Sequence, residues 1–407
     1  MPRVTRYPRA RFKMKILREL IQVTGFRFGG VNIGLKNQSL DFGGIVANEP
    51  CAAAAVFTKN NFPGAPVIVG REHVADGILQ AIVVNSKNAN VATGIAGIEA
   101  SRNTCFWLGE ELKIPPQMVL PSSTGVIGRP LDTTKIQTGC KILANHLGGS
   151  IEFSARFADA IMTTDHYPKF AHVVLESGTK ILGIAKGAGM VEPNMATMLS
   201  YIITDGDLQS EYLRTALQQA VNQSFNRISI DSDTSTSDTV VLLSAGHKKT
   251  DLNDFQISLN ALCCDLAKQI VQDGEGATKL IELKISGAQD KKSALLFAKS
   301  VINSPLVKTA IYGADPNWGR FVMAIGKVFD YPIQLENLKI HFGKDATRVC
   351  LDAEHVEDMA LVEALRPMLQ GKEVFIEIEL GMGTFSERVW GCDLSEGYVA
   401  ENAFYTT

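Results

Sequence analysis

The chain has 407 residues, a formal net charge of −3 and a hydrophobic fraction of 45%, so it reads as an ordinary globular protein with one large layered domain or two to three smaller ones. The small net charge implies no broad cationic field and argues against nucleic acid as the main partner. No apolar run reaches the roughly 18 residues that suggest a membrane span, so we expect no membrane association.

The seven cysteines are scattered and lack the spacing of metal ligands or of a secreted disulfide scaffold. We therefore expect reduced thiols, a cytoplasmic location and no metal. Residues 1–24 are predicted to form a basic N-terminal tail. Its early basic residues resemble a transit peptide, but the stretch has no serine and Met14 is an alternative start. A plain basic tail is the favoured reading and a targeting role the alternative.

Short apolar runs alternate with amphipathic segments, which predicts mixed α and β layers. Buried strands are expected at residues 51–57, 81–84 and 240–243, and a half-buried strand at 374–380, where apolar residues alternate with Phe375, Glu377 and Glu379. The glutamates suggest that one face of this last strand is wet. Apolar residues at helical spacing predict helices at 210–224, 254–272 and 360–369.

The most unusual segment is KGAGMVEPNMATMLS at 186–200, between two apolar runs. A strand, an irregular turn and a second strand fit it. The glycines can adopt backbone angles closed to other residues, and Pro193 restricts its own φ and the conformation of Glu192. Such a turn can strain the peptide bond between Ala196 and Thr197.

If the Thr197 hydroxyl attacks its own preceding carbonyl, an ester forms, and its hydrolysis frees the amine of Thr197. An α-amine has a reference pKa of about 7.7–8.0 and can serve as the base for its own hydroxyl. From the residues alone, however, a threonine in such a place is more often an ordinary strand residue, and the glycines more often mark a simple tight turn.

Eight strings in order resemble motifs of the glutamate N-acetyltransferase/ornithine acetyltransferase family, over about Gly25 to Thr407. They are NSKNAN at 85–90, PSSTGVIG at 121–128, MTTD at 162–165, KGAGMVEPNMATML at 186–199, DSDTSTSDT at 231–239, DGEGATK at 273–279, GADPNWGR at 313–320 and ENAFYTT at 401–407. In that family the threonine after the alanine is exposed by self-cleavage.

The resemblance implies a role for each matching position. Thr197 is the nucleophile, with the cleavage site between Ala196 and Thr197, and Thr124 with Gly125 stabilises the oxyanion. The positions that match the binding site for the amino-acid substrate are Thr163, Lys186, Thr197, Glu275, Asn402 and Thr407. Each of these also has a plain reading as a turn or surface residue. The seven histidines have no assigned role.

Two positions depart from the family pattern. Lys87 stands where glycine is usual, and Ala92 where cysteine is common. A lysine at position 87 implies either a backbone angle that is not strictly left-handed or local strain.

The resemblance further implies an αββα-like core with a smaller C-terminal subdomain. After cleavage, residues 25–196 form an alpha chain and 197–407 a beta chain, assembled as an α₂β₂ heterotetramer. The expected reaction moves an acetyl group from N-acetylornithine to glutamate in cyclic arginine biosynthesis. No cofactor is needed, and acetyl-coenzyme A remains open as a co-substrate. The dinucleotide fingerprint fails, since Gly187-x-Gly189 is followed by Glu192.

Two rival functions remain. One is an N-terminal-nucleophile amidohydrolase or aminopeptidase, in which water replaces glutamate as the acceptor. The other is an uncleaved, non-catalytic protein that binds metabolites.

Overall fold

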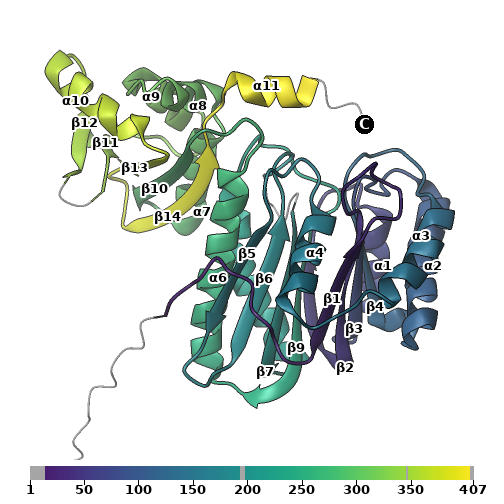
Figure 1. The fold of residues 1–407 in the computed structure, drawn as a ribbon. Coiled ribbons are helices and arrows are strands. Elements are labelled where there is room, and N and C mark those ends of the chain that lie inside the picture. The colour runs from purple at the N-terminus through teal and green to yellow at the C-terminus, as the bar shows by residue number, and fades with distance from the viewer. Residues whose placement is uncertain (1–13, 193–197, 345–346, 404–407) are drawn as a thin grey trace, which may run out of the picture.

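The computed structural model describes residues 14–192, 198–344 and 347–403 and arranges them in two layered units (Figure 1). The larger unit contains an eight-stranded sheet in the order β4-β3-β2-β9-β7-β6-β5, with β1 paired to β2. Its strands are β1 (Phe26–Val31), β2 (Phe42–Phe57), β3 (Ile78–Asn85), β4 (Val119–Ser123), β5 (Lys169–Val174), β6 (Lys180–Lys186), β7 (Leu199–Asp207) and β9 (Thr239–Lys249).

Strand β2 belongs to both halves of this sheet. Its residues 42–47 pair with β1, its ladder with β3 is irregular between Val46 and Cys51, and its residues 52–57 pair with β9. One long strand therefore connects a half that contains β1, β3 and β4 to a half that contains β5, β6, β7 and β9.

Alternation of side chains along the strands separates an inner from an outer face of each half. Val84 of β3 and Ile203 of β7 belong to one buried cluster, which lies between the halves. Their neighbours point outward: Val83 packs with α1, α2 and α3, and Ile202 packs with α5 and α6. The order of layers is helix, sheet, sheet, helix, and the predicted αββα-like core is confirmed. The helices of this unit are α1 (Ala65–His73), α2 (Gly94–Leu112), α3 (Thr133–Ala144), α4 (Ile151–Ile161), α5 (Ser210–Gln223) and α6 (Leu252–Gln272).

The smaller unit, also predicted, is built on a six-stranded sheet in the order β12-β11-β13-β10-β14-β8. Its strands are β8 (Ile228–Ser229), β10 (Leu280–Ala288), β11 (Lys339–Phe342), β12 (Val349–Asp352), β13 (Glu373–Glu379) and β14 (Phe385–Cys392). Its helices are α7 (Lys291–Ile302), α8 (Pro305–Tyr312), α9 (Trp318–Gly326), α10 (Met359–Gln370) and α11 (Glu396–Ala403). Three 3₁₀ turns occur at Pro116–Met118, Phe225–Arg227 and Leu335–Asn337.

The segments that periodicity predicted as strands and helices are confirmed, in β2, β3, β9 and β13 and in α5, α6 and α10. The glutamate-bearing face of β13 is only partly exposed to solvent. Glu373 and Glu379 are exposed, whereas Glu377 forms ion pairs with Lys284 at 3.0 Å and Arg348 at 3.1 Å.

The part of the predicted tail that the structure describes, residues 14–24, lies along the larger unit. Leu17 pairs with His172 of β5 through two backbone hydrogen bonds, Arg18 forms an ion pair with Asp265 of α6 at 3.0 Å, and Val23 is buried. Residues 1–13 lie outside the described ranges.

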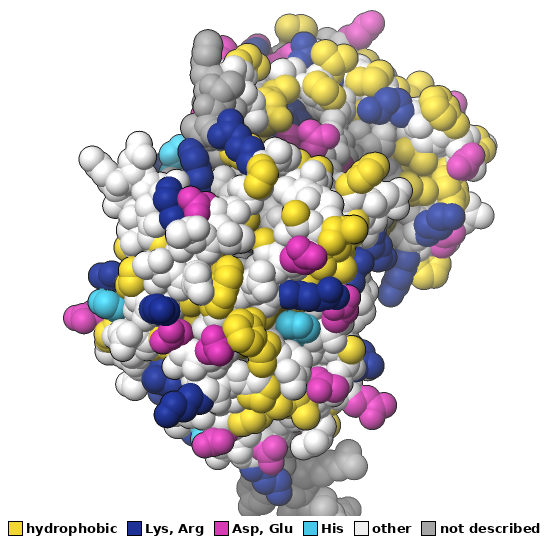
Figure 2. Space-filling model, turned by 90° about the vertical axis from the view of Figure 1, so that its right-hand side faces the viewer, with side chains coloured by type: hydrophobic (Ala, Val, Ile, Leu, Met, Phe, Trp, Pro, Cys, Tyr) yellow, Lys and Arg dark blue, Asp and Glu magenta, His cyan; other side chains and the backbone are white. Residues whose placement is uncertain are grey.

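Charged side chains of both signs are interspersed on the face in Figure 2, in keeping with the small net charge. Of the helices described, no single one is long and apolar enough to cross a membrane, although α7 and α8 together, bent by 59°, meet the length and composition of a span.

Phe157 of α4 is fully buried where the halves of the first sheet meet, with ring centroids 6.1 Å from Phe28 and 5.4 Å from Tyr201. We expect Phe157→Ala to lower the free energy of unfolding by about 3–5 kcal/mol, because it removes buried contacts and leaves a cavity. Phe329→Ala is the matched control, since Phe329 is 89% exposed, and its effect should stay within about 0.5 kcal/mol. Urea unfolding of both variants followed by circular dichroism measures this, and equal midpoints would contradict the assigned packing.

Candidate active site

A polar cavity of about 130 Å³ lies at the edge of the first sheet where β3, β4 and β6 end and the segment leading into β9 begins. Six of the residues singled out in the sequence line it: Thr124, Gly125, Thr163, Lys186, Glu275 and Asn402. They come from widely separated parts of the chain, so the fold brings them together, while their roles stay predictions. Ala196, Thr197 and Thr407 lie outside the described residues.

The turn after β4 presents Thr124 and Gly125 to this cavity. The Thr124 N–H donates to the Asn85 carbonyl at 3.0 Å, which ties the turn to the end of β3. Gly125 has φ +128°, and a Cβ added there would lie 2.2 Å from the carbonyl carbon of Lys87. Only glycine fits this close approach, which leaves the Gly125 backbone beside the cavity.

Lys87, which replaces the family's glycine, has φ +82°, and Ala92 has φ +56°. The backbone at Lys87 is therefore left-handed, and of the two alternatives raised by the sequence, local strain is the one observed. The Lys87 carbonyl accepts the Val126 N–H at 3.0 Å. The strained loop therefore supports the turn that carries Thr124 and Gly125.

Lys186, the last residue of β6, is only 4% exposed. Its Nζ donates to Thr163 Oγ1 at 2.6 Å and to Thr124 Oγ1 at 3.4 Å. Thr163 and its neighbour Thr164 both line the cavity, but Thr163 is the one that Lys186 contacts. A buried ammonium group that holds two hydroxyls is suited to bind a carboxylate.

Asp165 holds this arrangement in place, and the sequence analysis did not single it out. Its fully buried carboxylate lies 3.6 Å from Lys186 Nζ and 2.7 Å from Lys169 Nζ, and it accepts the N–H groups of Thr163 and Gly187 at 2.9 and 2.6 Å. Burial alone would raise the pKa of Asp165, but the adjacent Lys186 and Lys169 hold it well below its ordinary value. The one sequence signal was its place at the end of the MTTD string.

A second buried carboxylate, Asp273 at the end of α6, completes the network. It pairs with Lys169 at 2.5 Å and with His166 Nδ1 at 3.1 Å. The other ring nitrogen of His166 lies 3.9 Å from Glu401 of α11, so this histidine, which the sequence left without a role, connects α6 and α11 beside the cavity.

Glu275 forms another part of the cavity wall. Its N–H donates to the Ala188 carbonyl at 2.8 Å, and its carboxylate accepts the Asn402 side-chain amide at 2.8 Å. A Cβ on Gly189 would lie 2.2 Å from this carboxylate, so glycine at 189 leaves room for the Glu275 carboxylate in its observed position. Lys186 and Glu275 thus give the cavity one positive and one negative group.

The chain is firmly held on both sides of residues 193–197. Upstream, the Met190 and Val191 N–H groups donate to Asp231, and the Glu192 side chain accepts from Asn303 of the smaller unit at 2.7 Å. Downstream, the Met198 N–H donates to Asp238 Oδ1 at 2.9 Å. The two fixed ends flank the predicted cleavage site.

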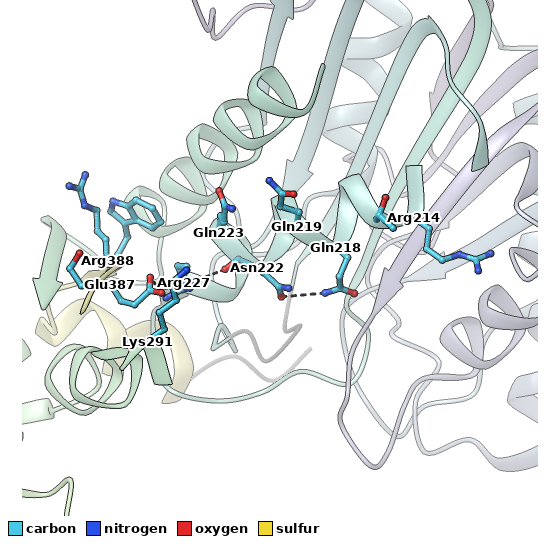
Figure 3. Close-up of a pocket in the computed structure, with 12 residues that line it drawn as sticks. Arg214, Gln218, Gln219, Asn222, Gln223, Arg227, Lys291, Glu387 and Arg388 are labelled. Atoms are coloured by element: carbon cyan, nitrogen blue, oxygen red, sulfur yellow. Dashed lines mark hydrogen bonds and ion pairs between the residues drawn. The ribbon is translucent and has the colours of Figure 1, made fainter. Parts of the chain in front are cut away.

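Another, larger hollow of about 860 Å³ lies between α5 and β14 (Figure 3). None of the predicted site residues lines it. Two of its cations are already paired, Arg227 with Glu387 and Arg388 with Glu282, each at 2.8 Å. In the part of the chain that the structure describes, no group of three or more His, Cys, Asp or Glu side chains is placed to hold a metal ion.

The chain matches one family model and resembles several known proteins. The model of the ArgJ family matches residues 27–407. The chain is 44% identical to "arginine biosynthesis bifunctional protein ArgJ 2" of Clostridium acetobutylicum, over 94% of this chain and 97% of that protein. It is 42% identical to "glutamate N-acetyltransferase Oat2" of Streptomyces clavuligerus, over 94% and 98%. The solved ornithine acetyltransferase of Mycobacterium tuberculosis, complexed with ornithine, is 30% identical and has a TM-score of 0.43, over 45% of this chain and 98% of that chain.

The Asp165 network makes a prediction about stability and pH. Asp165→Asn should lower the free energy of unfolding at pH 7 by about 3–5 kcal/mol, because two buried ammonium groups lose their shared anion. The pKa of Asp165 is lowered in the folded state, so its contribution is complete above the unfolded value of about 4 and is lost as the pH falls below it.

Urea unfolding of the wild type and of Asp165→Asn should therefore show a constant difference from pH 6 to 8 that narrows below about pH 4. Asp207→Asn, at an exposed position of β7, is the control and should change little. A difference that widens in acid would contradict the assignment.

Proposed function

We propose a reaction for this chain, which belongs to the ArgJ family. In the proposed reaction, this acyltransferase moves an acetyl group from N-acetylornithine to glutamate through an acetyl-Thr197 intermediate. The observation that carries the proposal is the gathering of Thr124, Gly125, Lys186 and Glu275 around one cavity, near the described segments that flank residues 193–197. The relatives that resemble this chain over nearly its whole length are named for arginine biosynthesis and glutamate N-acetyltransfer.

The chain first cleaves itself. Thr197 Oγ1 attacks the carbonyl carbon of Ala196, and the peptide bond is exchanged for an ester. Water then hydrolyses the ester and leaves the free α-amine of Thr197. The hydrogen bonds from Val191 to Asp231 upstream and from Met198 to Asp238 downstream support this step, because they fix the described chain on both sides of the bond that is cut.

Acetyl transfer follows in two halves. Thr197 attacks the acetyl group of N-acetylornithine while its own amine takes the hydroxyl proton, and ornithine leaves. The amine of glutamate then attacks the acetyl-threonine. The Thr124 hydroxyl and the Gly125 N–H stabilise the oxyanion in both halves, an effect of roughly 3–4 kcal/mol per donor in comparable sites.

Both amino acids use the same groups. Lys186 and Thr163 bind the α-carboxylate that ornithine and glutamate share, and Glu275, held by Asn402, accepts from the amine of the substrate. Thr407 completes the substrate site in the proposal. The acetyl amide energy is conserved in the product, so the reaction requires no metal or redox cofactor.

The proposal also includes an α₂β₂ assembly of the cleaved chains, residues 25–196 and 197–407, and leaves acetyl-coenzyme A as a second acetyl donor. The alternative is an N-terminal-nucleophile amidohydrolase or aminopeptidase, in which water takes the acetyl group.

Self-cleavage is tested by intact-mass analysis of the purified protein. The wild type should give two chains, the second beginning at Thr197, because the hydroxyl cuts the bond before it. Thr197→Ala should give one intact chain of 407 residues. Thr215→Ala, on the exposed face of α5, should cleave like the wild type. An intact wild-type chain would instead favour the uncleaved, metabolite-binding alternative.

Transfer is separated from hydrolysis by supplying N-acetylornithine with and without glutamate. We expect ornithine release to depend on glutamate, with ping-pong kinetics and equimolar N-acetylglutamate, because the acetyl-enzyme waits for its acceptor. Chromatographic quantification of ornithine and N-acetylglutamate measures this. Steady release of ornithine and acetate without glutamate would identify a hydrolase.

A further inference from the structure

Asp238 is a buried carboxyl group beside the cleavage site that no role yet explains. It is 1% exposed, and one oxygen, Oδ1, accepts the Met198 N–H at 2.9 Å. Its other oxygen, Oδ2, is buried and has no hydrogen-bond partner among the residues that the structure describes. The nearby Thr58 hydroxyl donates instead to the Ser235 carbonyl, at 2.6 Å. A buried carboxylate oxygen without a partner is costly and rarely kept without a use.

The position of Asp238 connects it to the reaction. It lines a narrow hollow of about 10 Å³ together with Thr124, Lys186 and Met198, and Thr124 and Lys186 also line the larger cavity. The nitrogen that it binds belongs to the peptide bond that joins Thr197 to Met198. Asp238 is therefore anchored one peptide bond from the proposed nucleophile.

Self-cleavage needs a base that the mechanism of the mature enzyme does not supply. In the mature enzyme the α-amine of Thr197 is the base for its hydroxyl. Before cleavage that nitrogen is an amide, which cannot accept a proton at neutral pH. A different base is needed for the first step.

We propose that Asp238 is this base in the uncleaved chain, an inference that rests on the proposed self-cleavage before Thr197. The Asp238 carboxylate takes the Thr197 hydroxyl proton as the bond from Thr197 Oγ1 to the carbonyl carbon of Ala196 forms. The carbon–nitrogen bond between Ala196 and Thr197 then breaks, and the departing nitrogen receives that proton. Water finally hydrolyses the ester to the Ala196 carboxylate and the Thr197 hydroxyl.

The surroundings of Asp238 suit this role. Complete burial raises its pKa well above the ordinary value, while the Met198 N–H, the nearby Thr58 hydroxyl and the charge of Lys186 act in the opposite direction. A raised pKa makes a carboxylate a stronger base, which is how enzymes adapt carboxylates to proton transfer. Of the described residues around the narrow hollow, Lys186 is the cationic one, and its charge opposes the effect of burial on the pKa of Asp238.

Asp238→Asn is a sharp test, because the asparagine carbonyl can still accept the Met198 N–H while the second oxygen becomes an NH₂ group without basicity. We expect self-cleavage to slow by about 10²–10⁴-fold, the usual contribution of a general base. The rate is measured by cell-free synthesis of the full chain followed by timed intact-mass analysis.

Asp205→Asn is the matched control. Asp205 is equally buried and also accepts one backbone N–H, from Lys180 at 2.7 Å. Its other oxygen lies 3.3 Å from Lys248 Nζ, and it stands near the far end of β7. This variant should cleave like the wild type. A small acid supplies the second readout: added formate should restore cleavage of Asp238→Ala in proportion to its concentration, because it returns a carboxylate to the vacated space.

Cleavage of Asp238→Asn at the control rate would overturn the assignment. Slow cleavage with no recovery of Asp238→Ala in formate would also overturn it, since the residue would then act only by holding the backbone. If the wild type and Asp205→Asn both stay intact, the proposed self-cleavage itself fails. If both cleave and Asp238→Asn does too, only the role of Asp238 fails.

Discussion

The contact between the Asp165 carboxylate and its two lysines is the interaction on which the rest of the site depends. Asp165 and Lys169 have fully buried side chains and Lys186 is nearly so, and charges are brought into such an interior only when each has a partner of opposite sign. By satisfying both lysines, Asp165 fixes Lys186 at the end of β6. Through the N–H groups of Thr163 and Gly187 it also sets the two backbone segments that flank Lys186. The positions of Lys186 and Thr163 in the cavity wall are therefore set before any ligand binds.

The smaller unit also contributes to the cavity and to the chain segment before residue 193. Asn303 of this unit donates to Glu192, α11 contributes Asn402 to the cavity wall, and the buried Lys308 of α8 donates to the carbonyl of Ile230, next to Asp231. Asp231 in turn holds the backbone at Val191. The segment upstream of residue 193 is thus held by elements of both units, and both must be folded before that segment takes its final path.

Much of the fold was predictable because periodicity reports local burial. The four-residue repeat of α5 and the alternation in β13 each reflect one buried face, and both were confirmed. The residues around the cavity came from motif resemblance, which orders sites along the chain without placing them in space.

The charge network was not predictable. Lys169 follows Asp165 by four residues, a spacing that on a helix would suggest a surface pair, and its burial depends on Asp273, about a hundred residues away. Asp238 could not be singled out for the same reason. The string DSDTSTSDT contains three aspartates, and only the fold shows that Asp238 is buried with an oxygen that lacks a hydrogen-bond partner in the described part of the chain.

The charges around the cavity also bear on which acetyl donor suits it. Among the described residues that line it, Lys186 is the one cation and Glu275 the one anion, a pair that matches the opposite charges of an amino acid. A donor with several phosphates would gain one favourable charge and meet one unfavourable charge there. In the proposed reaction the same walls serve ornithine and glutamate in turn, because both carry the α-carboxylate that we propose Lys186 and Thr163 bind.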